Sequence, residues 1–93
     1  MNRSIWKFPF ATTDSFEISM PKAAFILDVQ VQEHHPCLWA LVNVEAPMVT
    51  RHFRVYGTGQ PLNHAPGMYI GTYQDHGGAL VFHMFEVLEF ASL

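Results

Sequence analysis

Seven short apolar or alternating runs, each ended by a turn signal, constrain this chain more than any other feature. They span residues 5–8, 16–20, 25–33, 37–44, 49–56, 68–74 and 79–87. No stretch combines helical periodicity with the capping signals of a helix of ordinary length. Short strands at regular spacing are typical of antiparallel sandwiches and small barrels. The sequence therefore predicts a single all-β domain over residues 1–93, a small antiparallel β-sandwich or roll of about seven strands.

The alternation of side chains predicts how these strands are covered. Residues 37–44 and 79–87 are apolar at odd and even positions alike, which indicates strands that are covered on both faces. Residues 25–33 alternate strictly, so one face of that strand is expected to carry Phe25, Leu27, Val29 and Val31. Pro9 is expected to end the first strand because proline cannot donate to a β-ladder.

Charged residues make up only 14% of the chain, while hydrophobic residues make up 49%. An average globular protein has roughly 25% charged residues. So few charges cannot cover the surface of a small domain, and we expect an exposed apolar patch. Such patches usually mark self-association or a partner site, so the expected state is a homo-oligomer.

The charge and cysteine content exclude several classes of protein. A net charge of −3 and five Lys and Arg residues provide no basic stripe for nucleic-acid binding. The single Cys37 excludes an internal disulfide and fits a reducing cytoplasm. The first residues lack the apolar core of a signal peptide, and no run reaches the ~20 apolar residues of a membrane span. We expect a cytoplasmic protein that does not enter a membrane.

Metal and catalytic chemistry have little support in the sequence. The six histidines include the adjacent pair His34 and His35, which would point to opposite faces of an extended strand. No Gly-x-Ser-x-Gly turn is present, and the eight acidic residues, Glu86 among them, are mostly isolated on turns or solvent faces. A cross-strand pair of His83 and Asp28 is the remaining candidate for acid–base chemistry, although a hydrogen-bonded histidine on a half-buried face explains His83 as well. We therefore expect no metal, no cofactor and no catalytic residue.

A binding surface is the better-supported hypothesis. If the strand faces align, stacking rings, a guanidinium and polar groups gather on one face beside a glycine-rich loop. The glycines would also let backbone N–H groups approach an anion, although a strand exit with positive φ explains them as well. The predicted ligand-binding residues are Trp39, Arg54, Tyr56, Gly57, Thr58, Gly59, Tyr69 and His83. Gln30, Gln32 and Tyr73 are further candidates for the same face.

Three interpretations of this surface stay open. Stacking planes with a guanidinium suit a nucleotide-like small molecule. The same residue types are common in protein–protein hot spots. The aromatic residues could equally be packed in the core or in a dimer interface.

The motifs at residues 5–9 (Ile-Trp-Lys-Phe-Pro), 54–59 (Arg-Val-Tyr-Gly-Thr-Gly) and 77–83 (Gly-Gly-Ala-Leu-Val-Phe-His) resemble those of a family of small uncharacterised bacteriophage and prophage β-proteins. The C-terminal tail, residues 87–93, is longer than the tail that is usual in that family. The resemblance implies an accessory, non-enzymatic binding protein in the host bacterial cytoplasm. Such a protein would antagonise a bacterial defence pathway by sequestering a nucleotide-derived small molecule. The alternative is a protein–protein interaction module that masks a host defence protein.

Overall fold

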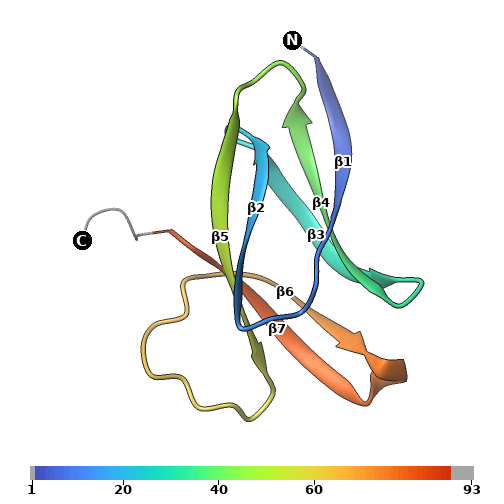
Figure 1. Ribbon diagram of the computed structural model, residues 1–93, viewed down its shortest axis with the longest axis vertical. Coiled ribbons are helices and arrows are strands. Elements are labelled where there is room, and N and C mark those ends of the chain that lie inside the picture. The colour runs from blue at the N-terminus through green and yellow to red at the C-terminus, as the bar shows by residue number, and fades with distance from the viewer. Residues whose placement is uncertain (1, 89–93) are drawn as a thin grey trace.

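The computed structural model describes residues 2–88, which form seven antiparallel strands (Figure 1). The strands are β1 (Arg3–Pro9), β2 (Ser15–Pro21), β3 (Phe25–Gln32), β4 (His35–Asn43), β5 (Met48–Gly57), β6 (Met68–Asp75) and β7 (Leu80–Val87), with a 3₁₀ turn at His76–Gly78. Their ends lie within two residues of the ends of the predicted runs. This confirms the all-β prediction. The predicted strand through residue 87 is β7, whereas residues 89–93 of the tail lie outside the described residues.

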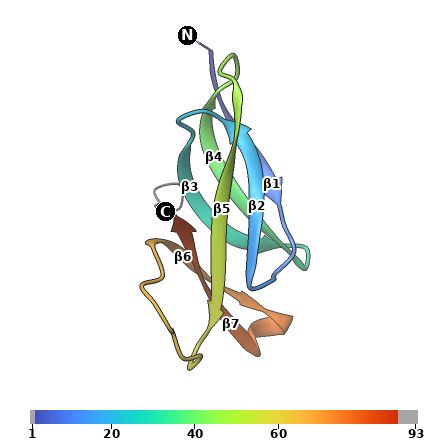
Figure 2. The same ribbon diagram turned by 60° about the vertical axis from the view of Figure 1, so that its left-hand side comes forward.

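The strands form two sheets, one in the order β1-β4-β3 and the other in the order β2-β5-β7-β6. The view in Figure 2 shows β5 running along most of the length of the molecule. β4 is the middle strand of the first sheet, and β5 and β7 are interior strands of the second. Most inward residues of β4 and β7 are buried in the core, and the outward residues Trp39, Leu41 and Phe85 are half-buried, so the outer faces of these two strands are covered only in part.

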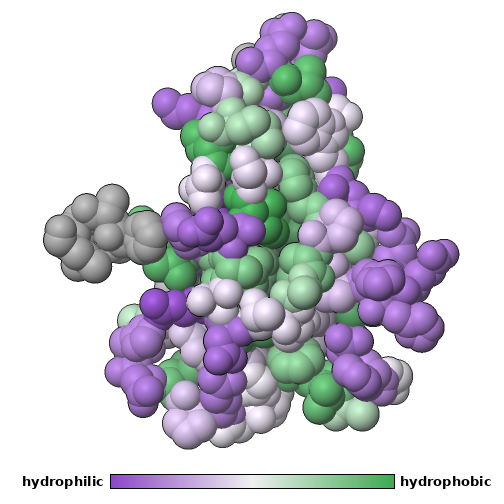
Figure 3. Space-filling view, in the orientation of Figure 1, coloured by the Kyte–Doolittle hydropathy of each residue, from purple (hydrophilic) through white to green (hydrophobic). Residues whose placement is uncertain are grey.

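The core lies between the two sheets. Leu38, Met20 and Met84 are fully buried there, and Phe53 is 1% exposed. Figure 3 shows hydrophobic residues along the middle of the molecule and hydrophilic residues at both sides. The strands β3 and β6 lie against each other, so the two sheets meet closely at this edge and the sandwich approaches a roll.

A β-bulge in β3 changes the face on which its first residues lie. Ile26 pairs with Ala40 and Asp28 pairs with Trp39, so Leu27 is the extra residue. Val29 is buried in the core, whereas Phe25 and Leu27 are 66% and 45% exposed. The prediction that all four alternating residues share one face is therefore wrong for Phe25 and Leu27. Strict alternation cannot reveal a bulge, since one inserted residue exchanges the two faces.

The environment of Glu86 also differs from the prediction. It is 6% exposed, and Arg51 donates to its two carboxylate oxygens from Nε at 2.7 Å and from Nη2 at 2.8 Å. The Nη1 group of Arg51 donates to the carbonyl of Ala24 at 2.6 Å. The prediction that Glu86 is isolated on a solvent face is wrong. The bidentate pair instead satisfies both charges between β5 and β7.

Candidate functional site

The outer face of the four-stranded sheet brings most of the predicted binding residues together. Phe53 and Val55 of β5 point into the core, so Arg54 and Tyr56 point outward. The register places Arg54 beside Phe85 of β7, and Phe85 beside Tyr69 of β6. One step along the strands, Tyr56 lies beside His83, and His83 beside Thr72. Period-two alternation predicts the outward faces of β5 and β7, whereas on β6 a bulge at Ile70 is what places Tyr69 and Thr72 on the same face.

Phe85 is the centre of this face, and sequence reasoning missed it. Its ring lies 5.8 Å from the ring of Tyr56 and 5.5 Å from that of Tyr69, edge to face in both cases. Phe85 is half-buried, while Tyr69 is 56% exposed. The signal was present, because Phe85 has the same strand parity as His83. The three rings form an aromatic cluster with edges and faces that a planar ligand would contact.

A chain of hydroxyl groups holds His83 beside the aromatic cluster. Its Nε2 lies 2.7 Å from Thr58 Oγ1, and its Nδ1 lies 2.9 Å from Thr72 Oγ1. Thr72 continues the chain to the hydroxyl of Tyr69 at 2.6 Å. Among residues 2–88 no carboxylate hydrogen-bonds to this ring. The candidate pair of His83 with Asp28 does not form, since Asp28 lies on the other sheet and bonds to Val29 and Gln30. The alternative, a hydrogen-bonded histidine on a half-buried face, is the one that the structure shows.

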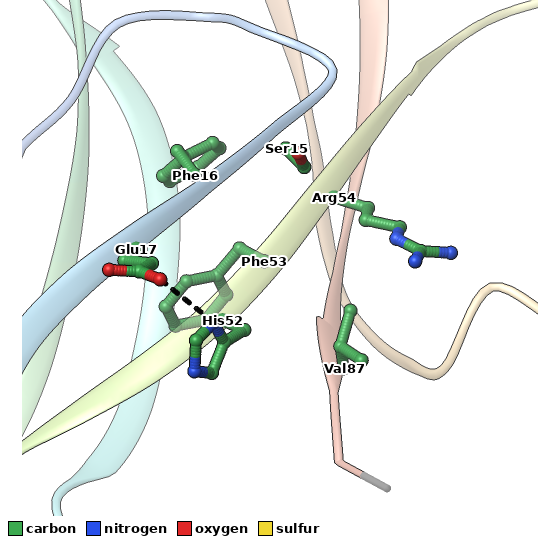
Figure 4. Close-up of a pocket in the computed structure, with 7 residues that line it drawn as sticks. All are labelled: Ser15, Phe16, Glu17, His52, Phe53, Arg54 and Val87. Carbon is green, nitrogen blue, oxygen red and sulfur yellow. Dashed lines mark ion pairs between the residues drawn. The ribbon is translucent and has the colours of Figure 1, made fainter. Parts of the chain in front are cut away.

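Arg54 supplies the permanent positive charge of this face. It is half-buried, and its guanidinium contacts His64 from the segment between β5 and β6. Arg54 also borders a hollow of about 560 Å³, at whose other side Glu17 and His52 form an ion pair at 3.4 Å. Figure 4 shows the guanidinium extending away from that ion pair. The hollow and the aromatic cluster therefore meet at Arg54.

The glycine-rich loop forms a tight turn at the end of β5. Gly57 N donates to Gln60 Oε1 at 3.0 Å, and Thr58 N donates to Val81 O at 3.1 Å. Gln60 N donates back to Gly57 O, and Gly59 has a φ of 88°. These features describe a turn of type II with glycine at its third position. The backbone N–H groups of Gly57 and Thr58 are used within the fold, so the interpretation as a strand exit is the correct one.

The structure does not bring Trp39 to this face. Trp39 lies on β4, and its side chain is on the outer face of the three-stranded sheet with Gln30 and Gln32. Tyr73 is 4% exposed and packs in the core. The predicted common face is therefore wrong for these residues. Trp39 differs because alternation within a strand does not say which sheet the strand joins. Tyr73 differs because a bulge at Ile70 exchanges the two faces of β6 between Tyr69 and Tyr73.

Other groups with potential chemistry are accounted for locally. Cys37 is 2% exposed, and its thiol lies 3.5 Å from the carbonyl of His35. Among residues 2–88 no three His, Cys, Asp or Glu side chains gather in a way that would hold a metal ion. The same residues include no helix long and apolar enough to cross a membrane.

Comparison with known proteins identifies the family of this fold. Residues 1–92 match a family described as a domain of unknown function, DUF7352. The chain belongs to this family. No curated protein and no solved structure matches it. Membership of DUF7352 agrees with the expectation of an uncharacterised family.

Proposed function

We propose that this DUF7352 protein is a non-enzymatic binding protein that captures a nucleotide-derived small molecule on the outer face of its four-stranded sheet. One observation carries the proposal. Arg54 on β5 pairs directly with Phe85 on β7. Phe85 is the centre of the aromatic cluster that it forms with Tyr56 and Tyr69. A cation beside stacked rings matches a molecule that joins an anionic group to a planar base.

The chemistry of each group supports this ligand class. A guanidinium binds phosphate oxygens in a planar, bidentate way and is always charged. Its contact with His64 uses part of a group that has five N–H donors. Aromatic rings contribute about 1–3 kcal/mol for each base that stacks on them. The hydroxyls of Thr72 and Tyr69, with the ring of His83, provide donors and acceptors at the rim of the aromatic cluster.

Among the described residues the group that orients His83 is the neutral hydroxyl of Thr72 and not a carboxylate. This favours binding over hydrolysis, because a catalytic histidine is usually held by a carboxylate that stabilises the imidazolium formed when it takes a proton. The resemblance to bacteriophage and prophage proteins supplies the context. In a host bacterial cytoplasm, sequestration of a nucleotide signal would antagonise a defence pathway. This step rests on resemblance alone.

A thermal-shift screen against cyclic and linear nucleotides, dinucleotides and ADP-ribose derivatives tests the proposal. A ligand at ~100 times its Kd stabilises by about 2.7 kcal/mol, which raises the Tm of a domain of this size by about 11–22 °C. Arg54→Ala should abolish the shift while the apo Tm is retained. Lys22→Ala removes an exposed cation outside this face and is the matched control, with an unchanged shift.

Two further results separate the alternatives. Mass spectrometry after heat denaturation should recover the ligand intact, whereas a converted ligand would make the protein an enzyme. No shift with any nucleotide would contradict the proposal, as would an unchanged shift in folded Arg54→Ala. In those cases one stoichiometric partner in a pull-down would favour the alternative function, the masking of a host protein. The exposed Phe25 and Ile5 of the other sheet are the observation that favours this alternative.

A further inference from the structure

The outer face of the three-stranded sheet carries an apolar patch that the proposed ligand site does not use. Ile5 is 59% exposed, Phe25 66% and Leu27 45%, and Trp39 and Leu41 lie half-buried between them. The outer face of an antiparallel sandwich is usually polar. The bulge in β3 creates the departure, because it places Phe25 and Leu27 on the same outer side as Asp28. Leu27, Ile5 and Trp39 also line a hollow of about 490 Å³.

Two cross-strand rows define the pattern on this apolar patch. One row is Ile5, Leu41 and Phe25, which is apolar on all three strands. The next row is Lys7, Trp39 and Asp28, with a cation on β1, a ring on β4 and an anion on β3. In each row β4 provides the middle residue.

We propose that a second copy of this chain covers the apolar patch, in a face-to-face dimer whose two-fold axis runs along β4. Rotation about that axis lays β1 of one copy over β3 of its partner and keeps each row over the same row. Ile5 then meets Phe25 of the partner, and Trp39 meets its own counterpart. Lys7 meets Asp28 of the partner twice, so the patch is complementary to itself as an isologous interface requires.

Lys7 and Asp28 can each form a further hydrogen bond with the partner copy. Lys7 Nζ donates to Gln32 Oε1 at 2.8 Å, and an ammonium has three donors. Asp28 accepts from Val29 N and Gln30 Nε2, both at 2.8 Å, and a carboxylate has about four acceptor sites. Three strands give a face only about 14 Å wide. The area that such a narrow face can bury is smaller than that of a standard protein–protein interface. We therefore expect a dimer that exchanges with monomers at micromolar concentration.

Sedimentation velocity from about 1 μM to about 500 μM tests the dimer. The mass should rise from the 10.6 kDa of one chain to twice that value. Lys7→Glu places a carboxylate against Asp28 of the partner, and Asp28→Lys places two ammonium groups together. Each variant should weaken the dimer more than about tenfold, since like charges across an interface cost several kcal/mol. Thr50→Glu, on the outer face of β5 in the other sheet, is the charge control and should dimerise normally.

The decisive arm is a mixture of the two weakened variants. A Lys7→Glu copy and an Asp28→Lys copy complement each other at both contacts, so mixing them should restore a dimer. Circular dichroism melting shows that each variant is folded, and Ile5→Ser provides a neutral disruption of the same patch. Wild-type protein that stays monomeric, single variants that dimerise normally, or folded variants whose mixture stays monomeric would each overturn the proposal. If the apolar patch binds a different protein instead of a second copy, the wild-type protein would stay monomeric.

Discussion

At the scale of single residues, the pair Arg51–Glu86 is the strongest electrostatic feature of the core. The Glu86 side chain is 7% exposed and that of Arg51 is 21% exposed, so water screens the pair little. We predict that Glu86→Ala lowers the free energy of unfolding by about 3 kcal/mol, because it leaves a largely buried guanidinium without its anion. Urea denaturation measures this change.

Two controls define the cause. Glu17→Ala removes a carboxylate from an exposed pair with His52 and should cost less than about 1 kcal/mol. The double variant Arg51→Met with Glu86→Met removes both charges and should be much less destabilised than Glu86→Ala. Equal losses for Glu86→Ala and Glu17→Ala would contradict the assignment.

The buried phenol of Tyr73 should make the stability of the folded protein decrease at alkaline pH. Burial raises the pKa of its phenol, a nearby Asp75 carboxylate adds to the rise, and the hydrogen bond with Thr12 opposes it. The folded protein therefore holds this proton at a higher pH than the unfolded chain does. Its contribution to stability is complete below the unfolded pKa, near 10, and is lost as the pH rises through the higher folded pKa.

Denaturation between neutral pH and pH above about 10 checks this sign. The Tyr73→Phe variant should show a shallower alkaline loss of stability, although it also loses the 2.7 Å contact with Thr12 Oγ1. An alkaline slope identical to that of the wild type would show that Tyr73 does not titrate in this way.

At the scale of elements, the contact between β3 and β6 depends on Gly71. A Cβ at Gly71 would lie 2.7 Å from Val29 Cγ1, and Val29 is 2% exposed. We predict that Gly71→Ala costs about 1–3 kcal/mol through overpacking. In Gly71→Ala with Val29→Ala, the total loss should be about 1 kcal/mol smaller than the sum of the two single losses. Strict additivity in urea denaturation would contradict the close approach of the two strands.

Element positions also show where sequence reasoning succeeded. Strands end where Pro9, Asp75 and similar turn residues interrupt alternation, which is a local effect of backbone geometry. The bulge at Leu27 was not predictable in the same way. Its position is fixed by the pairing of Asp28 with Trp39, a contact between two strands rather than a property of either one.

At the scale of the whole molecule, the two outer faces have different chemistry. Arg54, Tyr56 and His83 lie on the face of the four-stranded sheet, and Ile5, Phe25 and Trp39 on that of the three-stranded sheet. The core separates the proposed ligand site from the proposed dimer face, so the two functions need not compete. Arg54→Ala should therefore dimerise as the wild type does, and Lys7→Glu should retain the nucleotide-induced thermal shift.

The amino-acid sequence by itself determined the all-β class, the seven strands and the faces of β5 and β7, because alternation and turn chemistry act over a few neighbouring residues. It thereby indicated Arg54, Tyr56 and His83 as one surface. Only the tertiary structure decided that Trp39 belongs to the opposite sheet, that Glu86 is buried against Arg51 and that Phe25 is exposed. Each of these depends on which strands pair and in what register, and those choices are made by contacts between distant parts of the chain.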